Sequence, residues 1–281
     1  MSSEFRPVLD HVVINVAGNL DPAADLYARL GFRLTERGHH TLGSSNNLAI
    51  FRSNYLELLG YLPERAQQRA DLWAHPLGLT GLVFRSHDPE AVYRAVQASG
   101  VPVLDPVQFS RPVALPGGTQ DARFAVIRLG ADVIENGRVF FCHHYTPELV
   151  WRLEWQDHPN GVTDITEFVL VSPDPAATGA VYDRIFGGGL LRQEGDRVSF
   201  DAGTATVTIL TPSGAAARFG DALPTLPEDG SARMVALVLA TASLDATAAA
   251  LDRGGIAHRP FEGGHLVAAA EAANVALAFT A

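Results

Sequence analysis

The sequence predicts an α+β fold in which four βαβββ modules pair into two domains. Three helix starts share one form, an Asp at the N-cap followed by Pro at the first helical position, and a weaker fourth copy lacks the Pro. An apolar or β-branched run precedes each start, and a short helical stretch ending at glycine follows it. The four starts, which lie 67, 86 and 71 residues apart, are at Asp21, Asp88, Asp174 and Asp245. This recurrence predicts a repeated supersecondary unit.

Three strands are predicted after each helix. In the first module they cover residues 32–36, 48–52 and 55–61. The later modules keep this order and run from about residue 79 to 145, from 165 to 211, and from 233 to the C-terminus. Pro147, Pro159 and an Asn-Gly turn at residues 160–161 separate modules 2 and 3. We therefore expect two domains, residues 1–160 and 161–281.

Composition narrows the function classes. The 281 residues are 47% hydrophobic and 19% charged, which excludes a disordered chain and suits about two domains. A net charge of −10 without a basic run argues against nucleic acid as a partner. All 21 basic residues are Arg, so mechanisms that need a lysine amine are excluded. The single cysteine, Cys142, and the lack of a signal-peptide pattern favour the cytoplasm, and no apolar run predicts a membrane partner.

Several runs in the first half carry a family resemblance. Asp-His-Val-Val-Ile at residues 10–14, Leu-Gly-Phe at 30–32 and Tyr-Leu-Glu-Leu-Leu at 55–59 resemble the vicinal oxygen chelate superfamily, which includes glyoxalase I, fosfomycin-resistance proteins and extradiol dioxygenases. Runs that resemble its glyoxalase-like domain branch lie at residues 43–46, 146–151 and 158–161. The resemblance implies paired modules that form incomplete barrels around a cavity, with metal ligands on the first and last strand of each module.

His11 and Glu57 are the first candidate metal ligands. Strand alternation places His11 on one face of its strand and the apolar Val12 and Ile14 on the other. On the last strand of the module, Glu57 lies opposite the face of its apolar neighbours. Because a carboxylate inside an apolar strand is rarely buried unless it is paired or bound to a metal, these two side chains are expected to converge.

The second module offers a histidine pair. Parity puts His144 on the face of Cys142 and His143 on the opposite face. His11, Glu57 and His144 would then form a two-histidine, one-carboxylate metal set, and a β-bulge would substitute His143. Each histidine could instead be a hydrogen-bonded structural residue.

Other positions depart from the four-ligand pattern that the resemblance implies. In module 2 the first-strand ligand position of this pattern falls on Gly81. The last-strand position falls on or near Cys142, and at that position the family commonly has a carboxylate. In the second half the ligand positions fall on Glu167, Thr208, Arg233 and Ala276. These residue types cannot form a typical divalent site, and Arg233 is a candidate ion partner of Glu167. We therefore expect a structural half that could form a homodimer.

Two function classes follow. In the first, one divalent metal (Zn, Fe, Mn, Ni or Co) holds vicinal oxygens of a small carbonyl or oxygen-rich substrate, with Glu57 as catalytic base, in a lyase, isomerase or dioxygenase reaction. The resemblance makes His40, Ser45, Asn46 and Tyr55 candidate substrate-binding residues. In the second class the protein lacks a metal and binds or sequesters a small molecule, which the missing ligand at Gly81 favours.

Overall fold

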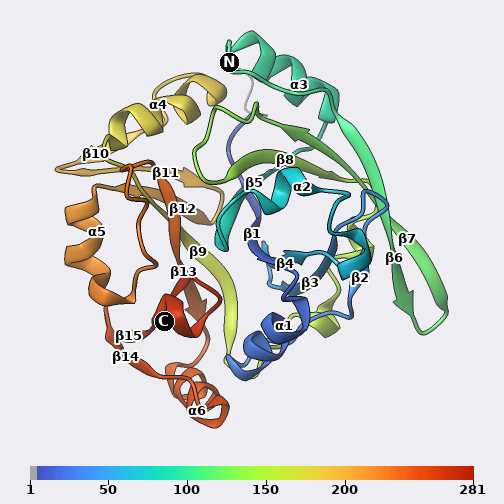
Figure 1. Cartoon of the computed structure of the whole chain (residues 1–281), viewed down its shortest axis with the longest axis vertical. Helices are drawn as coiled ribbons and strands as arrows, with labels where there is room; N and C mark the ends of the chain where they lie inside the picture. Colours follow the sequence, from blue (N-terminus) through green and yellow to red (C-terminus); the bar gives the residue numbers. More distant parts are fainter. Residues whose placement is uncertain (1–4) are drawn as a thin grey trace.

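Two eight-stranded mixed sheets, one from each half of the chain, form the fold that the computed structural model describes for residues 5–281 (Figure 1). The strands of the first sheet are β1 (Leu9–Ala17), β2 (Gly38–His39), β3 (Ser45–Ile50), β4 (Tyr55–Gly60), β5 (Gly78–Arg85), β6 (Val107–Leu115), β7 (Gly118–Arg128) and β8 (Arg138–His144). Its helices are α1 (Leu20–Arg29), α2 (Ala70–Trp73) and α3 (Pro89–Ala98).

The second sheet repeats this plan. Its strands are β9 (Val162–Val171), β10 (Arg192–Glu194), β11 (Arg197–Ala202), β12 (Ala205–Leu210), β13 (Arg233–Thr241), β14 (His258–Phe261), β15 (Gly264–Val267) and β16 (Ala276–Thr280). Its helices are α4 (Pro175–Phe186), α5 (Pro212–Phe219) and α6 (Leu244–Gly254). Short 3₁₀ helices lie at Pro63–Arg65, Pro147–Leu149, Leu153–Trp155, Gly220–Ala222 and Ala269–Glu271.

The strand orders show the modular plan directly. They are β2-β3-β4-β1-β5-β8-β7-β6 and β10-β11-β12-β9-β13-β16-β15-β14. In each sheet the first strand of a module pairs in parallel with the last strand of that module, and the first strands of the two modules pair antiparallel. The predicted fold class, four βαβββ modules in two incomplete barrels, is confirmed.

The predicted helix starts hold for two of the four modules. Asp88 and Asp174 accept hydrogen bonds from backbone N–H groups of α3 and α4, as N-cap residues do. In the other two modules the helix begins one residue before the Asp, so Asp21 and Asp245 lie in the first turn. Ser243 caps α6 instead. An Asp in the first turn of a helix also stabilises it, because its negative charge interacts favourably with the positive end of the helix dipole. An Asp can therefore mark the start of a helix from either position.

One predicted strand of the first module is wrong. The strand predicted at residues 32–36 does not form, and the edge of the sheet is the two-residue β2. The backbone N–H of Arg33 donates to the ring of His158, while Thr35 bonds to Leu48 through both its backbone and its hydroxyl. The segment therefore divides its hydrogen bonds between β3 and the connection to the second half.

Alternation along the strands separates two apolar layers. Val12, Leu58 and Phe84 of the first sheet share one large core with Phe168 and Leu237 of the second. The alternate residues of the first sheet face a separate cluster on its inner face. The two sheets therefore pack through their helix-bearing sides, and the inner face of the first sheet is free to hold a site. None of the helices in residues 5–281 is long and apolar enough to span a membrane.

The segment between the sheets is held by buried polar contacts. Asn160 donates to the Leu30 carbonyl from one side, and Asn54 exchanges two hydrogen bonds with the backbone of Ile165. The first contact fixes the connection at residues 145–161 to the end of α1, and the second fixes β9 to the β3–β4 turn. A domain boundary near residue 160 stays a prediction.

Candidate functional site

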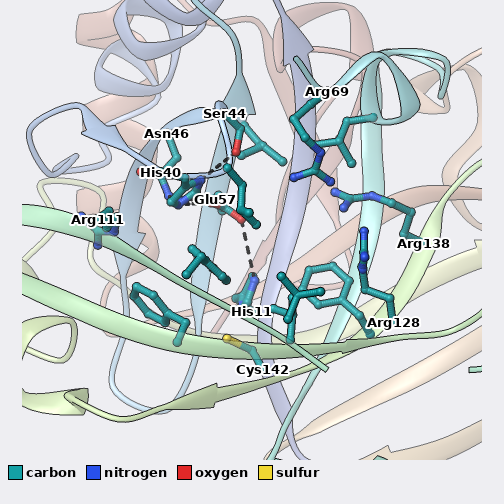
Figure 2. A pocket seen from close by; sticks show the side chains of 18 of the residues that line it. His11, His40, Ser44, Asn46, Glu57, Arg69, Arg111, Arg128, Arg138 and Cys142 are labelled. Atoms are coloured by element: carbon teal, nitrogen blue, oxygen red, sulfur yellow. Dashed lines mark hydrogen bonds and ion pairs between the residues drawn. The ribbon is translucent and has the colours of Figure 1, made fainter. Parts of the chain in front are cut away.

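A cavity of about 290 Å³ lies against the inner face of the first sheet (Figure 2). Its wall combines the polar side chains of β1, β3 and β4 with aromatic rings of β6, β7 and β8. The rings are those of Phe109, Phe124 and Phe140. A concave apolar site with a few convergent polar groups is the usual form of a small-molecule site.

His11 and Glu57 meet in this cavity, as the strand pattern predicts. In the parallel pairing of β1 with β4, His11 lies opposite Tyr55 and Val13 opposite Glu57, so both side chains project from the same face. His11 Nε2 is 3.7 Å from Glu57 Oε2, and both residues are buried. The ring of Tyr55 stacks on that of His11 with 4.3 Å between centroids and restricts its orientation.

Asp10 fixes the other side of the His11 ring. The pairing of β1 with β5 shifts between Leu9 and His11, and Asp10 lies at this irregularity. Its fully buried carboxylate accepts from His11 Nδ1 at 2.7 Å, His144 Nε2 at 2.9 Å and Arg85 Nε at 3.0 Å. Since a carboxylate only accepts, His11 carries its proton on Nδ1 and directs the Nε2 lone pair into the cavity.

The pKa of Asp10 shows the strength of these contacts. Burial alone would raise it, but the interactions with His144 and His11 outweigh burial and hold the pKa far below its usual range. Sequence reasoning missed Asp10. The argument used for Glu57, a carboxylate among apolar strand residues, applies equally to it.

A second hydrogen-bond chain holds Glu57. Asn46 Nδ2 donates to Glu57 Oε1 at 2.5 Å and to His40 Nε2 at 3.1 Å. The His40 ring in turn donates from Nδ1 to the Ser44 hydroxyl at 2.8 Å. Burial lowers the pKa of His40 to about 4, so the ring is neutral near pH 7 and can accept at Nε2. The chain engages one oxygen of Glu57 and leaves Oε2 directed toward His11.

The predicted substrate-binding residues lie in two places. His40, Asn46 and Tyr55 line the cavity. The Ser45 hydroxyl bonds to the ring of His39 instead, and its neighbour Ser44 lines the cavity. Alternation along β3 explains the difference, because adjacent side chains face opposite sides.

The histidine pair at the end of β8 also divides. Cys142 lines the cavity, whereas Phe141 packs in the core shared by the two sheets. His144 reaches His11 only through Asp10, and its Nδ1 has no hydrogen-bond partner within residues 5–281. His143 Nδ1 donates to the Ser86 carbonyl. The structure thus brings His11 and Glu57 together directly and joins His144 to them indirectly.

Asp10, Cys142 and His144 also form a cluster of three metal-ligand types. Their donor atoms all lie within 4.8 Å of one another. Burial raises the pKa of the Cys142 thiol well above its usual value, so the thiol is protonated unless a metal displaces its proton. The oxygens of Asp10 already accept three hydrogen bonds. In the pair of His11 and Glu57, by contrast, Nε2 of the histidine and Oε2 of the carboxylate both make no hydrogen bond within residues 5–281 and face each other in the cavity.

The geometry of that pair suits a divalent ion. Two ligand atoms at about 2.1 Å from one ion can be up to roughly 4.2 Å apart, and His11 Nε2 and Glu57 Oε2 lie within this limit at 3.7 Å. His40 Nε2, 3.9 Å from Glu57 Oε1, is the next histidine nitrogen near the same carboxylate.

Module 2 leaves no room for a first-strand ligand. Gly81 pairs with Val13 across β1 and β5, and a Cβ at this glycine would lie 2.5 Å from the Val13 Cβ. Because real Cβ atoms do not approach so closely, a side chain would force the two central strands apart. The absence of a ligand here follows from the packing of the central strands.

The second sheet has filled the equivalent space. Glu167 accepts from both terminal nitrogens of Arg218 on α5, at 2.8 and 2.7 Å. The expected partner was wrong, because Arg233 bonds to backbone carbonyls, one of them that of Leu77. Phe219, also on α5, is fully buried against the inner face. A helix thus occupies the place of the cavity.

Comparisons with known proteins agree with this fold. A family model described as a glyoxalase-like domain matches residues 9–186. A hypothetical protein from Staphylococcus aureus has a similar structure, with a TM-score of 0.62 and 13% identity, covering 98% of this chain and 100% of that one. None of the curated proteins matches the chain.

Two further solved structures share the fold. One is a mutant of 4-hydroxymandelate synthase from Streptomyces coelicolor, with a TM-score of 0.54 and 15% identity over 91% of this chain and 78% of that one. The other is a fusion of a xylose isomerase-like TIM barrel with a 4-hydroxyphenylpyruvate dioxygenase, with a TM-score of 0.55 and 13% identity over 91% of this chain and 40% of that one.

Proposed function

Since the chain belongs to the glyoxalase-like domain family of the vicinal oxygen chelate superfamily, we propose that its first half is a divalent-metal-dependent enzyme acting on a small carbonyl or oxygen-rich compound. The observation that carries the proposal is the approach of His11 Nε2 to Glu57 Oε2 within the cavity. Two buried groups with free lone pairs, each held by its own hydrogen-bond chain, form a prepared pair of ligands.

A bound divalent ion would supply Lewis-acid stabilisation of vicinal substrate oxygens. The protein's own part is to orient the two ligand atoms and to limit access of water. Asp10 holds the His11 ring by its Nδ1 proton, and Asn46 holds Glu57 by Oε1. The rings of Phe124 and Phe140 supply apolar walls.

Glu57 is also the proposed general base. Its Oε2 accepts no hydrogen bond within residues 5–281, so once displaced from the metal this oxygen can receive a proton from a substrate carbon or hydroxyl in the cavity. Proton transfer of this kind serves a lyase or an isomerase reaction. Dioxygenase chemistry would need iron as the metal, and the fold shared with the 4-hydroxyphenylpyruvate dioxygenase fusion is compatible with it.

His144 has a positioning role in this proposal. The sequence pattern made it the third ligand, but its Nε2 donates to Asp10 and its ring packs against Trp151 with 4.7 Å between centroids. It therefore acts on the site through the carboxylate that orients His11. His40 is the nearer candidate for a further ligand.

Metal binding tests the proposal most directly. We expect the protein to bind about one equivalent of Zn²⁺ or Co²⁺ and His11→Ala and Glu57→Ala to lose this binding. His87→Ala, at an exposed residue outside the cavity, is the matched control. Titration calorimetry and the visible spectrum of the Co²⁺ form measure the effect. Equal binding by all four proteins would overturn the assignment.

A metal-free binding protein is the second candidate. Gly81 provides no ligand and Cys142 offers only a protonated thiol, so module 2 adds no ready donor to the pair. In that case the cavity would sequester a small molecule without chemical change. Wild-type protein that neither contains nor binds a divalent ion, yet binds a small ligand in the cavity, would favour this function.

A further inference from the structure

Arginine dominates the charge of the cavity wall. Arg69, Arg111, Arg128 and Arg138 all line the cavity, and Glu57 is the one carboxylate among its lining residues. Figure 2 shows Arg69, Arg128 and Arg138 gathered on one side, with Arg111 on the other side and the pair of His11 and Glu57 between them. The wall therefore carries an excess of positive charge that Glu57 cannot balance.

Within the protein, this charge is poorly compensated. Arg69 pairs with Asp71, at 3.1 Å from both Nε and Nη2. No ion pair joins Arg111, Arg128 or Arg138 to a carboxylate anywhere in residues 5–281. Each of these three also has a buried nitrogen without a hydrogen-bond partner in that part of the chain. Arg111 is buried and Arg128 and Arg138 are half-buried, and because buried polar atoms in proteins are normally hydrogen-bonded, these nitrogens point to a missing partner.

The strands bring these side chains together. Arg128 of β7 lies opposite Phe140 of β8, two residues beyond Arg138. The guanidinium of Arg138 lies 5.3 Å from the ring centroid of Phe140. Arg69 comes from the segment before α2, which covers the same side of the cavity. The guanidinium groups of three arginines, from β7, β8 and the segment before α2, thus lie on one side of the cavity next to the ring of Phe140.

The arginines act on one another. Burial, and then the charges of Arg69 and Arg128, lower the pKa of Arg138 to about 10, while Glu57 and Asp71 oppose the shift. Arg138 therefore stays charged near pH 7 in spite of its neighbours. An anion placed among the three groups would relieve this repulsion and satisfy the unpartnered nitrogens.

We propose that Arg69, Arg128 and Arg138 form an anion subsite that binds a carboxylate or phosphate group of the substrate. The inference rests on the proposed function, because it places the reacting oxygens of the same molecule near His11 and Glu57. Planar guanidinium forks match both anions with paired hydrogen bonds. The adjacent Phe124 and Phe140 suit an aromatic or aliphatic body. The substrate class is a small organic acid or phosphate ester.

Benzoate, phenyl phosphate and the neutral isostere benzamide are suitable probes. Titration calorimetry with the protein as purified should show benzoate or phenyl phosphate binding roughly 10- to 100-fold more tightly than benzamide. The double variant Arg128→Gln/Arg138→Gln should lose this preference. Arg123→Gln, at an exposed residue of β7, is the matched control and should retain it. The better of the two anions identifies the preferred group.

Stability gives a second readout. If Arg138 serves a ligand, Arg138→Met should leave the midpoint of urea unfolding unchanged or raised, because it removes an unpaired, half-buried charge. If Arg138 is structural, the midpoint should fall. Equal binding of benzoate, phenyl phosphate and benzamide by the wild-type protein, or an unchanged preference in the double variant, would overturn the proposal.

The two proposals fail in different ways. Loss of the metal site in His11→Ala should leave a preference for the anions over benzamide. Loss of the anion subsite in Arg128→Gln/Arg138→Gln should leave Zn²⁺ binding intact. A wild-type protein that prefers anions but binds no metal would refute the proposed enzyme function alone, and the reverse result would refute the anion subsite alone.

Discussion

Replacing Asp10 by Asn tests whether its carboxylate controls the candidate site. The substitution keeps the size of the side chain and one oxygen, which can still accept from Arg85 Nε. It removes the negative charge and turns an N–H donor toward His11 and His144, the two other groups that now donate to Asp10. To accept from this donor, His11 must move its proton from Nδ1 to Nε2, which removes the lone pair from the cavity.

The expected magnitude follows from these contacts. Each hydrogen bond to a buried charged acceptor contributes about 1.5–3 kcal/mol, and two of the three are disturbed. A tautomer switch would return one neutral bond of about 1 kcal/mol. We therefore expect Asp10→Asn to lower the free energy of unfolding by about 2–5 kcal/mol, in keeping with the cost of breaking a buried ion pair.

The assay combines urea unfolding with Zn²⁺ titration. Metal affinity should fall roughly 10- to 100-fold, as is typical when a partner of a ligating histidine is lost. Asp105→Asn is the control, because Asp105 accepts from Tyr93 at the exposed surface and should change stability by less than about 0.5 kcal/mol. Wild-type stability and metal affinity in Asp10→Asn would refute the role assigned to the carboxylate.

Three further predictions concern other parts of the molecule. His144→Ala should weaken Zn²⁺ binding roughly 10-fold or more through Asp10, whereas His143→Ala should change mainly stability; the opposite ranking in calorimetry would contradict the positioning role. Burial lowers the pKa of His158, so the stability that the neutral ring contributes should be lost as the pH falls below the unfolded-state pKa of about 6.5. Between pH 7.5 and 5.5 the free energy of urea unfolding should therefore fall less in His158→Gln than in the wild type. Equal falls in the two proteins would count against this role of His158. Phe219→Ala should cost about 3–5 kcal/mol in urea unfolding without changing Zn²⁺ affinity, and a loss of affinity would show that the two inner faces are coupled.

Local chemistry in the sequence determined the modular fold and one half of the site. Alternation with a period of two is a property of each strand by itself, and it was enough to place Val12 in the shared core and His11 with Glu57 in the cavity. Cap chemistry is equally local, which is why Asp88 and Asp174 could be assigned to helix starts. These features need no knowledge of which strands become neighbours.

Tertiary structure decided the rest of the site. An irregularity in the pairing of β1 with β5 lies at Asp10, and only this register makes the carboxylate the link between His11 and His144. The gathering of Arg128 and Arg138 with Arg69 likewise depends on strands and a loop that are distant in the chain. Periodicity assigns a side chain to a face, but pairing across the sheet and the packing of α5 decide which faces enclose a cavity and which are filled.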